Sequence, residues 1–350
     1  MKKEALLYET LTNGKVRCHT CQRRCIIGEG ERGYCLTRIN QGGRLYSLIY
    51  GEVASISINP IEKKPVYHFF PGSRWLSLGA LGCNFRCPGC QNWELSHAKI
   101  DEKGRATHFL PPEELINLAK RHGCLGISWT FNEPTIWFEY TLEGAKLAKE
   151  QGLYTNYVTN GYITPEALDV IGPYLDVFRV DIKAFSSESY RRIAHIEDFT
   201  GILTVTKQAK QKWNMWVEVV TNITPGYNDD EAELQELASW ISQELGKSTP
   251  WHLTRFFPHL ELSHLNPTPI ATLERAYQIA KEKGLEYVYL GNVPNHPNEN
   301  TYCPHCGKLL IQRSIFDVVR YELDRGRCPN CKAEIPGKYE NLEEVQNVLS

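Results

Sequence analysis

Three cysteines share the short stretch Gly82-Cys83-Asn84-Phe85-Arg86-Cys87-Pro88-Gly89-Cys90, with the spacing C-x3-C-x2-C. Three thiolates on one loop can bind three irons of a 4Fe–4S cube, and the fourth iron then has no protein ligand. The alternative is a closed zinc knuckle that takes His97 as its fourth ligand. We favour the cluster, because an open metal position serves chemistry whereas a structural site is normally closed.

A second group of cysteines lies near the start of the chain, at Cys18, Cys21, Cys25 and Cys35, with the spacing C-x2-C-x3-C-x9-C. Four thiolates make a closed site, which fits either Zn²⁺ or an auxiliary iron–sulfur cluster. We favour a structural zinc, because closed four-cysteine sites are usually structural, and His19 could replace one thiolate. The spacing alone does not separate zinc from iron.

The third group gives the spacing C-x2-C-x21-C-x2-C, which is typical of a zinc ribbon. Its members are Cys303, Cys306, Cys328 and Cys331. Between the two pairs, residues 309–313 and 318–323 have the pattern of two hairpin strands. We therefore expect a β-rich zinc module after residue 295, followed by a short helix at 341–350.

Composition limits the other possibilities. The chain has 350 residues, twelve cysteines and a formal net charge of −2, so it has no overall field for nucleic acid or an anionic membrane. Eleven cysteines fall in the three groups, and Cys124 is expected to be a small buried hydrophobic residue. No apolar run is long enough to span a membrane and no signal peptide is evident, so we expect a cytoplasmic protein.

From residue 75 to about residue 292 strands and helices alternate, which predicts parallel strands joined by right-handed crossovers. Six or seven such units are too few for a complete eight-stranded barrel, so we expect a partial barrel of the α/β class. The predicted strands are 75–80, 126–130, 155–159, 177–182, 215–220, 252–256 and 286–290. The predicted helices are 112–120, 136–151, 231–244 and 273–283, and residues 44–50 and 53–58 predict a β-hairpin before the barrel.

Polar residues follow or end these predicted strands, where active sites of βα barrels are built. Each of them alone is more often a turn or cap residue, or for His252 a hydrogen-bonded core histidine, but together they predict one cavity next to the cysteine loop. The candidates are Asn132, Glu133, Asn160, Asp181, Lys183, Asn222, His252 and Asn292.

The C-x3-C-x2-C loop resembles the signature of radical S-adenosylmethionine (radical SAM) enzymes. The segments 60–65, 68–73 and 90–94 resemble the radical enzyme of the AmmeMemoRadiSam system, a relative of the pyruvate formate-lyase activating enzymes. The resemblance implies a TIM-like radical SAM barrel of the partial (βα)6 type. It also implies that S-adenosylmethionine chelates the open iron at Cys83, Cys87 and Cys90, and is cleaved reductively to a 5′-deoxyadenosyl radical that abstracts hydrogen from a substrate.

The same resemblance implies cofactor contacts for part of the polar set. Asn132-Glu133 occupies the place of a Gly-Gly-Glu motif without its glycines, and Asp181-Ile182-Lys183 matches an Asp-Leu-Lys motif. Asn160 matches part of an Asp-Thr-Asn-Gly motif whose first residue is replaced here by Val158, and His252 matches a histidine near the adenosyl group. A further departure is Gly89, where relatives carry an aromatic residue near the adenine.

The favoured interpretation is a radical SAM oxidoreductase acting on an unidentified substrate. An activating enzyme acting on a protein glycine is the first alternative, and a non-enzymatic RNA- or protein-binding module is a remote one, because the basic residues near 313–332 are diluted by acids. The expected partners are an electron donor such as flavodoxin or ferredoxin, and a protein substrate or AmmeMemoRadiSam partner proteins. We divide the chain into an N-terminal four-cysteine module with a hairpin (1–60), the barrel (61–295) and the zinc-ribbon-like module with its tail (296–350).

Overall fold

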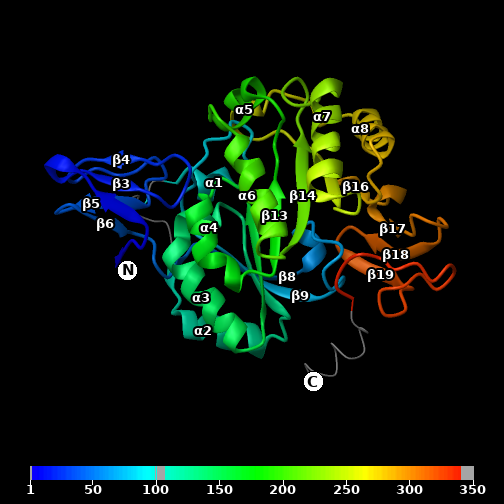
Figure 1. Ribbon diagram of the computed structural model, residues 1–350, viewed down its shortest axis with the longest axis horizontal. Helices are drawn as coiled ribbons and strands as arrows, with labels where there is room; N and C mark the ends of the chain where they lie inside the picture. Colours follow the sequence, from blue (N-terminus) through cyan, green and yellow to red (C-terminus); the bar gives the residue numbers. More distant parts are fainter. Residues whose placement is uncertain (1, 99, 101–106, 340–350) are drawn as a thin grey trace.

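A computed structural model of the chain describes residues 2–98, 100 and 107–339. Its centre is an eight-stranded open sheet in the order β16-β15-β14-β13-β12-β11-β9-β8 (Figure 1). The strands from β9 to β16 are parallel and follow one another in chain order, which confirms the partial barrel. Their bounds are β8 Ser55–Pro60, β9 Arg74–Gly79, β11 Gly126–Trp129, β12 Tyr154–Thr159, β13 Val177–Asp181, β14 Trp216–Ile223, β15 Trp251–Arg255 and β16 Val288–Gly291.

Helices cover the outer face of this sheet. Helix α2 shows why they form, since Pro112 opens it, Glu113 and Glu114 lie in its first turn, and Lys120 and Arg121 lie in its last. The helices are α1 Trp93–Ser96, α2 Pro112–Arg121, α3 Phe138–Glu150, α4 Pro165–Ile171, α5 Ser187–Ala194, α6 Thr200–Gln211, α7 Glu231–Trp240 and α8 Ile270–Glu282. The sequence predicts four of them and does not place α1, α4, α5 and α6, which lie in segments without a long uninterrupted apolar period.

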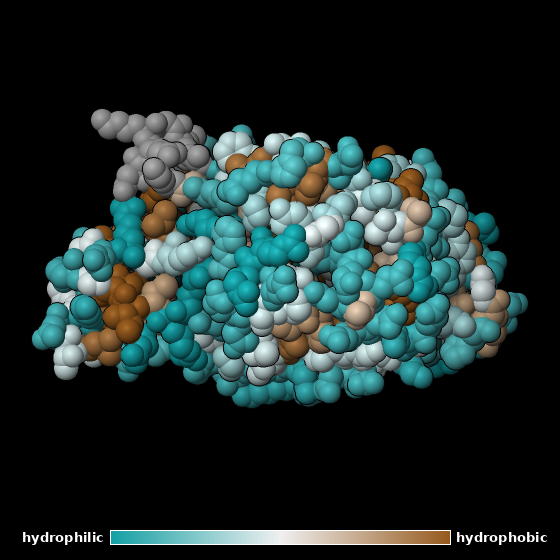
Figure 2. Space-filling view, turned by 90° about the horizontal axis from the view of Figure 1, so that it is seen from above, coloured by the Kyte–Doolittle hydropathy of each residue, from teal (hydrophilic) through white to brown (hydrophobic). Residues whose placement is uncertain are grey.

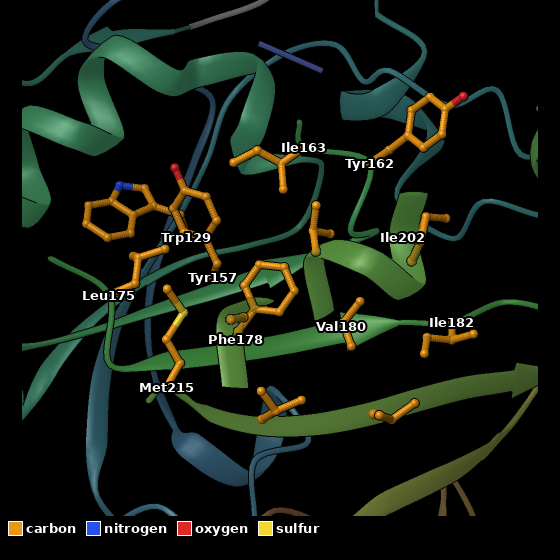
Figure 3. Packing of buried hydrophobic residues seen from close by; sticks show 14 of the residues in the cluster. Trp129, Tyr157, Tyr162, Ile163, Leu175, Phe178, Val180, Ile182, Ile202 and Met215 are labelled. Carbon is orange, nitrogen blue, oxygen red and sulfur yellow. The ribbon is translucent and has the colours of Figure 1, made fainter. Parts of the chain in front are cut away.

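The core lies between the outer face of the sheet and the helices. Trp129, Tyr157 and Phe178 are neighbours in register on β11, β12 and β13, and all three are fully buried (Figure 3). Successive residues of a strand point to opposite faces of the sheet. The residues that alternate with these aromatic residues along each strand therefore line the inner face of the barrel. There Arg179 lies beside Glu218 in the register of β13 and β14. The barrel is therefore apolar outside and carries charged groups inside.

The predicted hairpin between residues 44–50 and 53–58 is wrong. Strand β6 (Arg44–Ser47) pairs instead with β5 (Arg38–Gln41), and β8 pairs with β9 as the antiparallel edge of the barrel sheet. The turn between β5 and β6 is Gly42-Gly43, and both glycines have positive φ, as two-residue hairpin turns require. A Gly-Gly turn signal therefore determines the pairing, and Gly51 does not.

The N-terminal module forms two small sheets, β1-β6-β5 and β2-β3-β4. Their remaining strands are β1 Lys3–Glu4, β2 Tyr8–Thr10, β3 Val16–Cys18 and β4 Ile26–Ile27, while β7 Glu52–Val53 pairs with β10 His108–Phe109. In Figure 1 this module lies at one end of the molecule and the C-terminal module lies at the other. The two modules therefore flank the barrel from opposite sides.

The C-terminal module is a three-stranded antiparallel sheet, which confirms the predicted hairpin. Its strands are β17 Thr301–Tyr302, β18 Leu309–Ser314 and β19 Asp317–Tyr321. Leu310 and Ile311 of β18 share a buried cluster with Tyr287 and Tyr289 of the barrel. The module is thus docked onto the barrel, and the helix predicted at 341–350 lies outside the described residues. The domain boundaries at 60 and 296 stay predictions, although β8 joins the barrel sheet.

None of the described helices is long and apolar enough to cross a membrane. Figure 2 shows a face on which hydrophilic residues predominate and apolar residues form separate groups. Such a surface is ordinary for a protein in contact with water.

Candidate active site

The cysteine loop leaves the end of β9, on the side of the barrel that receives the N-terminal module (Figure 1). Cys83 is buried, and Cys87 and Cys90 are half-buried. The loop is held by Asn132, whose side chain accepts a hydrogen bond from the Ala80 N–H at 3.1 Å and donates to the Gly82 carbonyl at 2.8 Å. Asn132 therefore positions the loop through its backbone.

The three thiol groups suit several irons better than one small ion. The Phe85 N–H donates to the Cys83 sulfur at 3.4 Å, and the Cys90 sulfur lies 3.1 Å from the Ser96 hydroxyl oxygen. These three sulfurs do not all lie within 4.8 Å of one another. Burial raises the pKa of Cys83 well above its ordinary value and that of Cys87 to about 11, so the thiolates require the compensating charge of a metal.

Asp181 and Lys183 lie together at the end of β13. The Arg179 guanidinium donates to one Asp181 oxygen at 2.8 Å, and the Lys183 ammonium lies 3.8 Å from the other. Burial alone lowers the pKa of Lys183, but the charges of Asp181 and Cys87 outweigh burial and raise it above its ordinary value. Lys183 therefore carries a positive charge within electrostatic range of the cysteine loop.

Glu133 is buried and engaged by the protein itself. It is the N-cap of the short 3-10 helix Pro134–Trp137, accepting from the Thr135 N–H at 3.0 Å and the Thr135 hydroxyl at 2.5 Å. It also accepts from the Thr159 hydroxyl at 2.8 Å and the Asn160 N–H at 2.7 Å. Burial raises the pKa of Glu133, against these hydrogen bonds. The carboxylate thus joins the ends of β11 and β12 and caps the 3-10 helix, and its contact with the cofactor stays a prediction.

Asn160 links the end of β12 to the cysteine loop. Its amide donates to the Asn84 side-chain oxygen at 2.8 Å and lies 4.0 Å from the Cys83 sulfur, while its own oxygen accepts from the Tyr162 N–H. Of the sequence-predicted residues, the structure therefore brings Asn160 to the three cysteines by direct contact, and Lys183 and Asp181 by charge.

His252 occupies the same row of the sheet as Asp181, with Val220 of β14 between them. Its Nε2 lies 2.6 Å from a Glu218 oxygen, its ring stacks on Tyr289, and Tyr67 contacts it edge-on. Burial lowers the pKa of His252 despite the Glu218 carboxylate. The structure thus gives His252 the hydrogen-bonded core environment of the alternative interpretation.

Asn222 and Asn292 tie strand ends together. Asn222 donates to the Thr254 hydroxyl at 3.0 Å, and Asn292 donates to the Arg255 carbonyl at 3.1 Å. Both side chains act here as structural amides between neighbouring strands. At Gly89, an added Cβ would come within 2.9 Å of Leu262 and 3.1 Å of Phe256. These two apolar side chains therefore supply the wall at the position where relatives carry an aromatic residue.

Sequence reasoning missed two buried basic residues, Arg179 on the inner face of the sheet and Lys64 within electrostatic range of it. Lys64 donates to the Asn59 side-chain oxygen at 3.0 Å, and burial lowers its pKa to about 7. The Nε of Arg179 and the Ser77 hydroxyl are buried without a hydrogen-bond partner among the described residues. For Arg179 the available signal was a charged residue between the apolar residues Phe178 and Val180, since buried charges are rare unless they are functional or paired.

The C-terminal cysteines have the geometry of a single-ion site. Their four sulfurs all lie within 4.8 Å of one another. Among residues 2–98, 100 and 107–339, no other group of three or more His, Cys, Asp or Glu side chains meets this criterion. The Cys303 and Cys331 sulfurs are 3.5 Å apart, and those of Cys306 and Cys328 are 3.6 Å apart. Four sulfurs each ~2.3 Å from one Zn²⁺ stand ~3.8 Å apart, so the donor set fits zinc.

Replacing the exposed Cys306 and Cys331 together by serine is expected to reduce bound zinc by about one ion per chain, because two of four ligands are lost. Iron content should stay unchanged. Metal analysis of the purified variant, with Cys124→Ala as the control, measures this. Undiminished zinc would refute the ribbon site. Substitution is preferable to deleting the module, because deletion would uncover Tyr287 and Tyr289.

Comparison with known proteins agrees with this site. The family described as the Radical SAM superfamily matches residues 79–241, which contain the cysteine loop, Lys183 and the strands between them. The Bacterial Peptidase A24 N-terminal domain matches residues 288–350, the segment with the zinc-type cysteines. Both matches are to parts of the chain.

Three relatives illustrate the range of similarity. An uncharacterized protein of Methanocaldococcus jannaschii is 44% identical over 335 residues, which are 95% of this chain and 98% of that protein. The pyruvate formate-lyase 1-activating enzyme of Escherichia coli is 19% identical over 236 residues, 63% of this chain and 93% of the enzyme. A solved domain of a pyruvate-formate lyase-activating enzyme from Bacteroides vulgatus has a TM-score of 0.40 and 16% identity, covering 48% of this chain and 99% of that domain.

A cysteine triad at the exit of the first parallel strand, a partial barrel, the family match and the similarity to the Escherichia coli enzyme lead to one assignment. The chain belongs to the radical SAM superfamily and is related to the pyruvate formate-lyase activating enzymes.

Proposed function

We propose that this radical SAM enzyme uses Cys83, Cys87 and Cys90 to hold a 4Fe–4S cluster on which S-adenosylmethionine is cleaved reductively. When bound, these cofactors supply a 5′-deoxyadenosyl radical that abstracts hydrogen from the substrate. The observation that carries the proposal is the loop itself: three thiols at a strand exit, too widely spaced for one small ion, with no fourth cysteine in their motif. A flavodoxin or ferredoxin is the proposed class of electron donor.

We infer that Lys183 and Asp181 bind charged and polar groups of S-adenosylmethionine. Lys183 keeps its positive charge beside the cysteine loop, so it suits the carboxylate of the cofactor. Asp181 accepts from Arg179 and remains partly exposed, so it can accept from a ribose hydroxyl or an ammonium. Asn160 and Glu133 act as positioning residues, because the first contacts the loop and the second fixes the backbone of the first.

Replacing Lys183 by methionine should weaken S-adenosylmethionine binding by ~10- to 100-fold, since a charge-assisted hydrogen bond contributes ~1.5–3 kcal/mol. Iron content should remain normal. Titration of the reconstituted enzyme with the cofactor measures the effect, and Lys210→Met is the matched control because Lys210 bonds Thr249. If affinity is unchanged, Lys183 is only the ion-pair partner of Asp181. Glu133→Gln, by contrast, should lower the melting temperature through the lost cap.

Two substrate classes remain as proposals. Arg179 is buried on the inner face of the barrel and Lys64 is buried within electrostatic range of it, so a small substrate with a carboxylate or phosphate would pair with Arg179 and favour the charged form of Lys64. The similarity to the pyruvate formate-lyase activating enzyme favours a protein glycine instead. The AmmeMemoRadiSam relation also remains a proposal, and its partner proteins are natural candidates for a substrate screen. Following deuterium transfer from candidate substrates into 5′-deoxyadenosine distinguishes the classes.

A further inference from the structure

The four N-terminal cysteines surround a cavity at the contact between their module and the barrel. Cys18, Cys21, Cys25 and Cys35 all line it, together with Asn84 of the cysteine loop. Cys18 and Cys35 are buried, and Cys21 and Cys25 are half-buried. A zinc ion ~2.3 Å from each of four sulfurs fills the space between them and leaves no room for more. The distances between the sulfurs therefore decide whether one zinc ion or an iron–sulfur cluster fits.

The distances between the sulfurs favour a cluster over a single zinc ion. In the ribbon, paired sulfurs are 3.5 and 3.6 Å apart, as one zinc ion requires. No three of the N-terminal sulfurs lie within 4.8 Å of one another, and the three radical SAM cysteines share that wide spacing. A four-iron cube binds each thiolate at a different corner and holds the four sulfurs about 6 Å apart. The N-terminal sulfurs therefore resemble the sulfurs of the radical SAM loop in their spacing, and differ from those of the ribbon.

An unpartnered amide lines the same cavity. Asn84 is fully buried, its oxygen accepts from Asn160, and its Nδ2 has no hydrogen-bond partner among the described residues. Leaving a buried donor unpaired costs about 1–3 kcal/mol, so an acceptor in the cavity is expected. Cluster sulfurs accept such bonds, and N–H donors to them are a usual feature of iron–sulfur sites.

The cavity also adjoins the radical SAM loop. Asn84 directly follows Cys83, and the Arg23 guanidinium of the N-terminal module donates to the Asn84 carbonyl at 2.6 Å. An added Cβ at Gly82 would come within 2.8 Å of the Cys35 carbonyl oxygen. We propose that Cys18, Cys21, Cys25 and Cys35 hold a second iron–sulfur cluster, of the 4Fe–4S type and not zinc, packed against the loop of the first.

Counting metals on anaerobically reconstituted full-length protein tests this assignment. Wild type should contain about eight irons, eight sulfides and one zinc per chain, and the Cys83→Ala/Cys87→Ala/Cys90→Ala variant about four irons and one zinc. Adding Cys18→Ala and Cys35→Ala to that variant should remove the remaining iron and leave the zinc. The retained zinc also reports that the chain is folded.

A radical-loop variant with no iron and about two zincs per chain would overturn the proposal. If that variant does not fold, the wild-type count decides alone, because about four irons with two zincs contradicts the second cluster. The metal count and the cleavage assay test the two proposals separately. Wild type with about four irons that cleaves S-adenosylmethionine would refute the second cluster alone. Wild type with about eight irons and no cleavage would refute the proposed function alone.

Discussion

Replacing Cys83, Cys87 and Cys90 together by alanine should abolish the formation of 5′-deoxyadenosine from S-adenosylmethionine under dithionite. The three thiols are the proposed cluster ligands in the loop at the exit of β9, and without them the cofactor would have no iron to bind. Chromatographic quantification of 5′-deoxyadenosine in anaerobic reactions measures the loss. A fall to the background without protein is expected.

The control is Cys124→Ala, because Cys124 is a buried thiol before β11 and belongs to none of the three cysteine groups. Its product formation should stay near that of wild type. Ribbon zinc in the triple variant serves as evidence of folding. Product formation by a folded triple variant would show that the assigned loop does not bind the catalytic cluster.

Replacing Arg313 by methionine should reduce the free energy of unfolding by about 3–5 kcal/mol, the usual cost of breaking a buried ion pair by removing one partner. Arg313 lies on β18, its side chain is fully buried, and its Nε is 3.5 Å from a Glu62 oxygen. It also donates to the Thr301 hydroxyl and the Tyr67 carbonyl, and its guanidinium lies over the Tyr67 ring. Arg313 therefore connects the ribbon to the barrel part through an ion pair, hydrogen bonds and a ring contact.

This loss of stability should depend on pH. Burial raises the pKa of Glu62 from 4.5 to about 7, although Arg313 opposes the rise. A carboxyl group whose pKa is raised on folding stabilises the protein below its unfolded pKa, and that stability is lost as pH rises through the folded value. Without Arg313 the pKa should rise further, so the deficit should be larger at pH 8 than at pH 5.

Denaturant unfolding of wild type and Arg313→Met at both pH values measures these effects. The exposed Arg320→Met on β19 is the matched control, and its change should stay within about 0.5 kcal/mol. The Arg313→Met/Glu62→Gln double variant should recover part of the loss at pH 8, because no carboxylate is then left buried. An Arg313→Met protein as stable as wild type would show that the Arg313 contacts do not contribute to the docking of the ribbon.

The barrel could be predicted from the sequence because its strands are fully buried and repeat at regular intervals, so that the apolar runs alone mark them. The Val177–Asp181 strand illustrates this, since four of its five residues are buried. The N-terminal pairings could not be predicted in the same way. Short strands such as β6 carry little periodic signal, and their partner was set by the Gly42-Gly43 turn.

The part of the site whose residues lie close together in the sequence could be predicted. The cysteine spacing identifies the loop without any structure, whereas the inner-face position of Arg179 beside Glu218 depends on strand register. Glu133 shows the opposite limit. Its position after a strand suggested a ligand, but the side chain is occupied by Thr135, Thr159 and Asn160, and only tertiary contacts reveal this.

The spacing of cysteines in the sequence likewise does not distinguish a zinc site from an iron–sulfur site. The N-terminal and ribbon cysteines both form groups of four, and the sequence favours zinc for each. The distances between their sulfurs differ, however, because the ribbon residues converge from a compact hairpin sheet while the N-terminal ones surround a cavity. The difference depends on backbone paths that no motif encodes.

The proposed cleavage of S-adenosylmethionine is tested most directly by reducing the reconstituted wild-type protein anaerobically, adding S-adenosylmethionine, and quantifying the products. 5′-Deoxyadenosine and methionine should form in equal amounts, and only when the cluster is present and reduced. Intact S-adenosylmethionine after incubation with a fully loaded and reduced protein would contradict it.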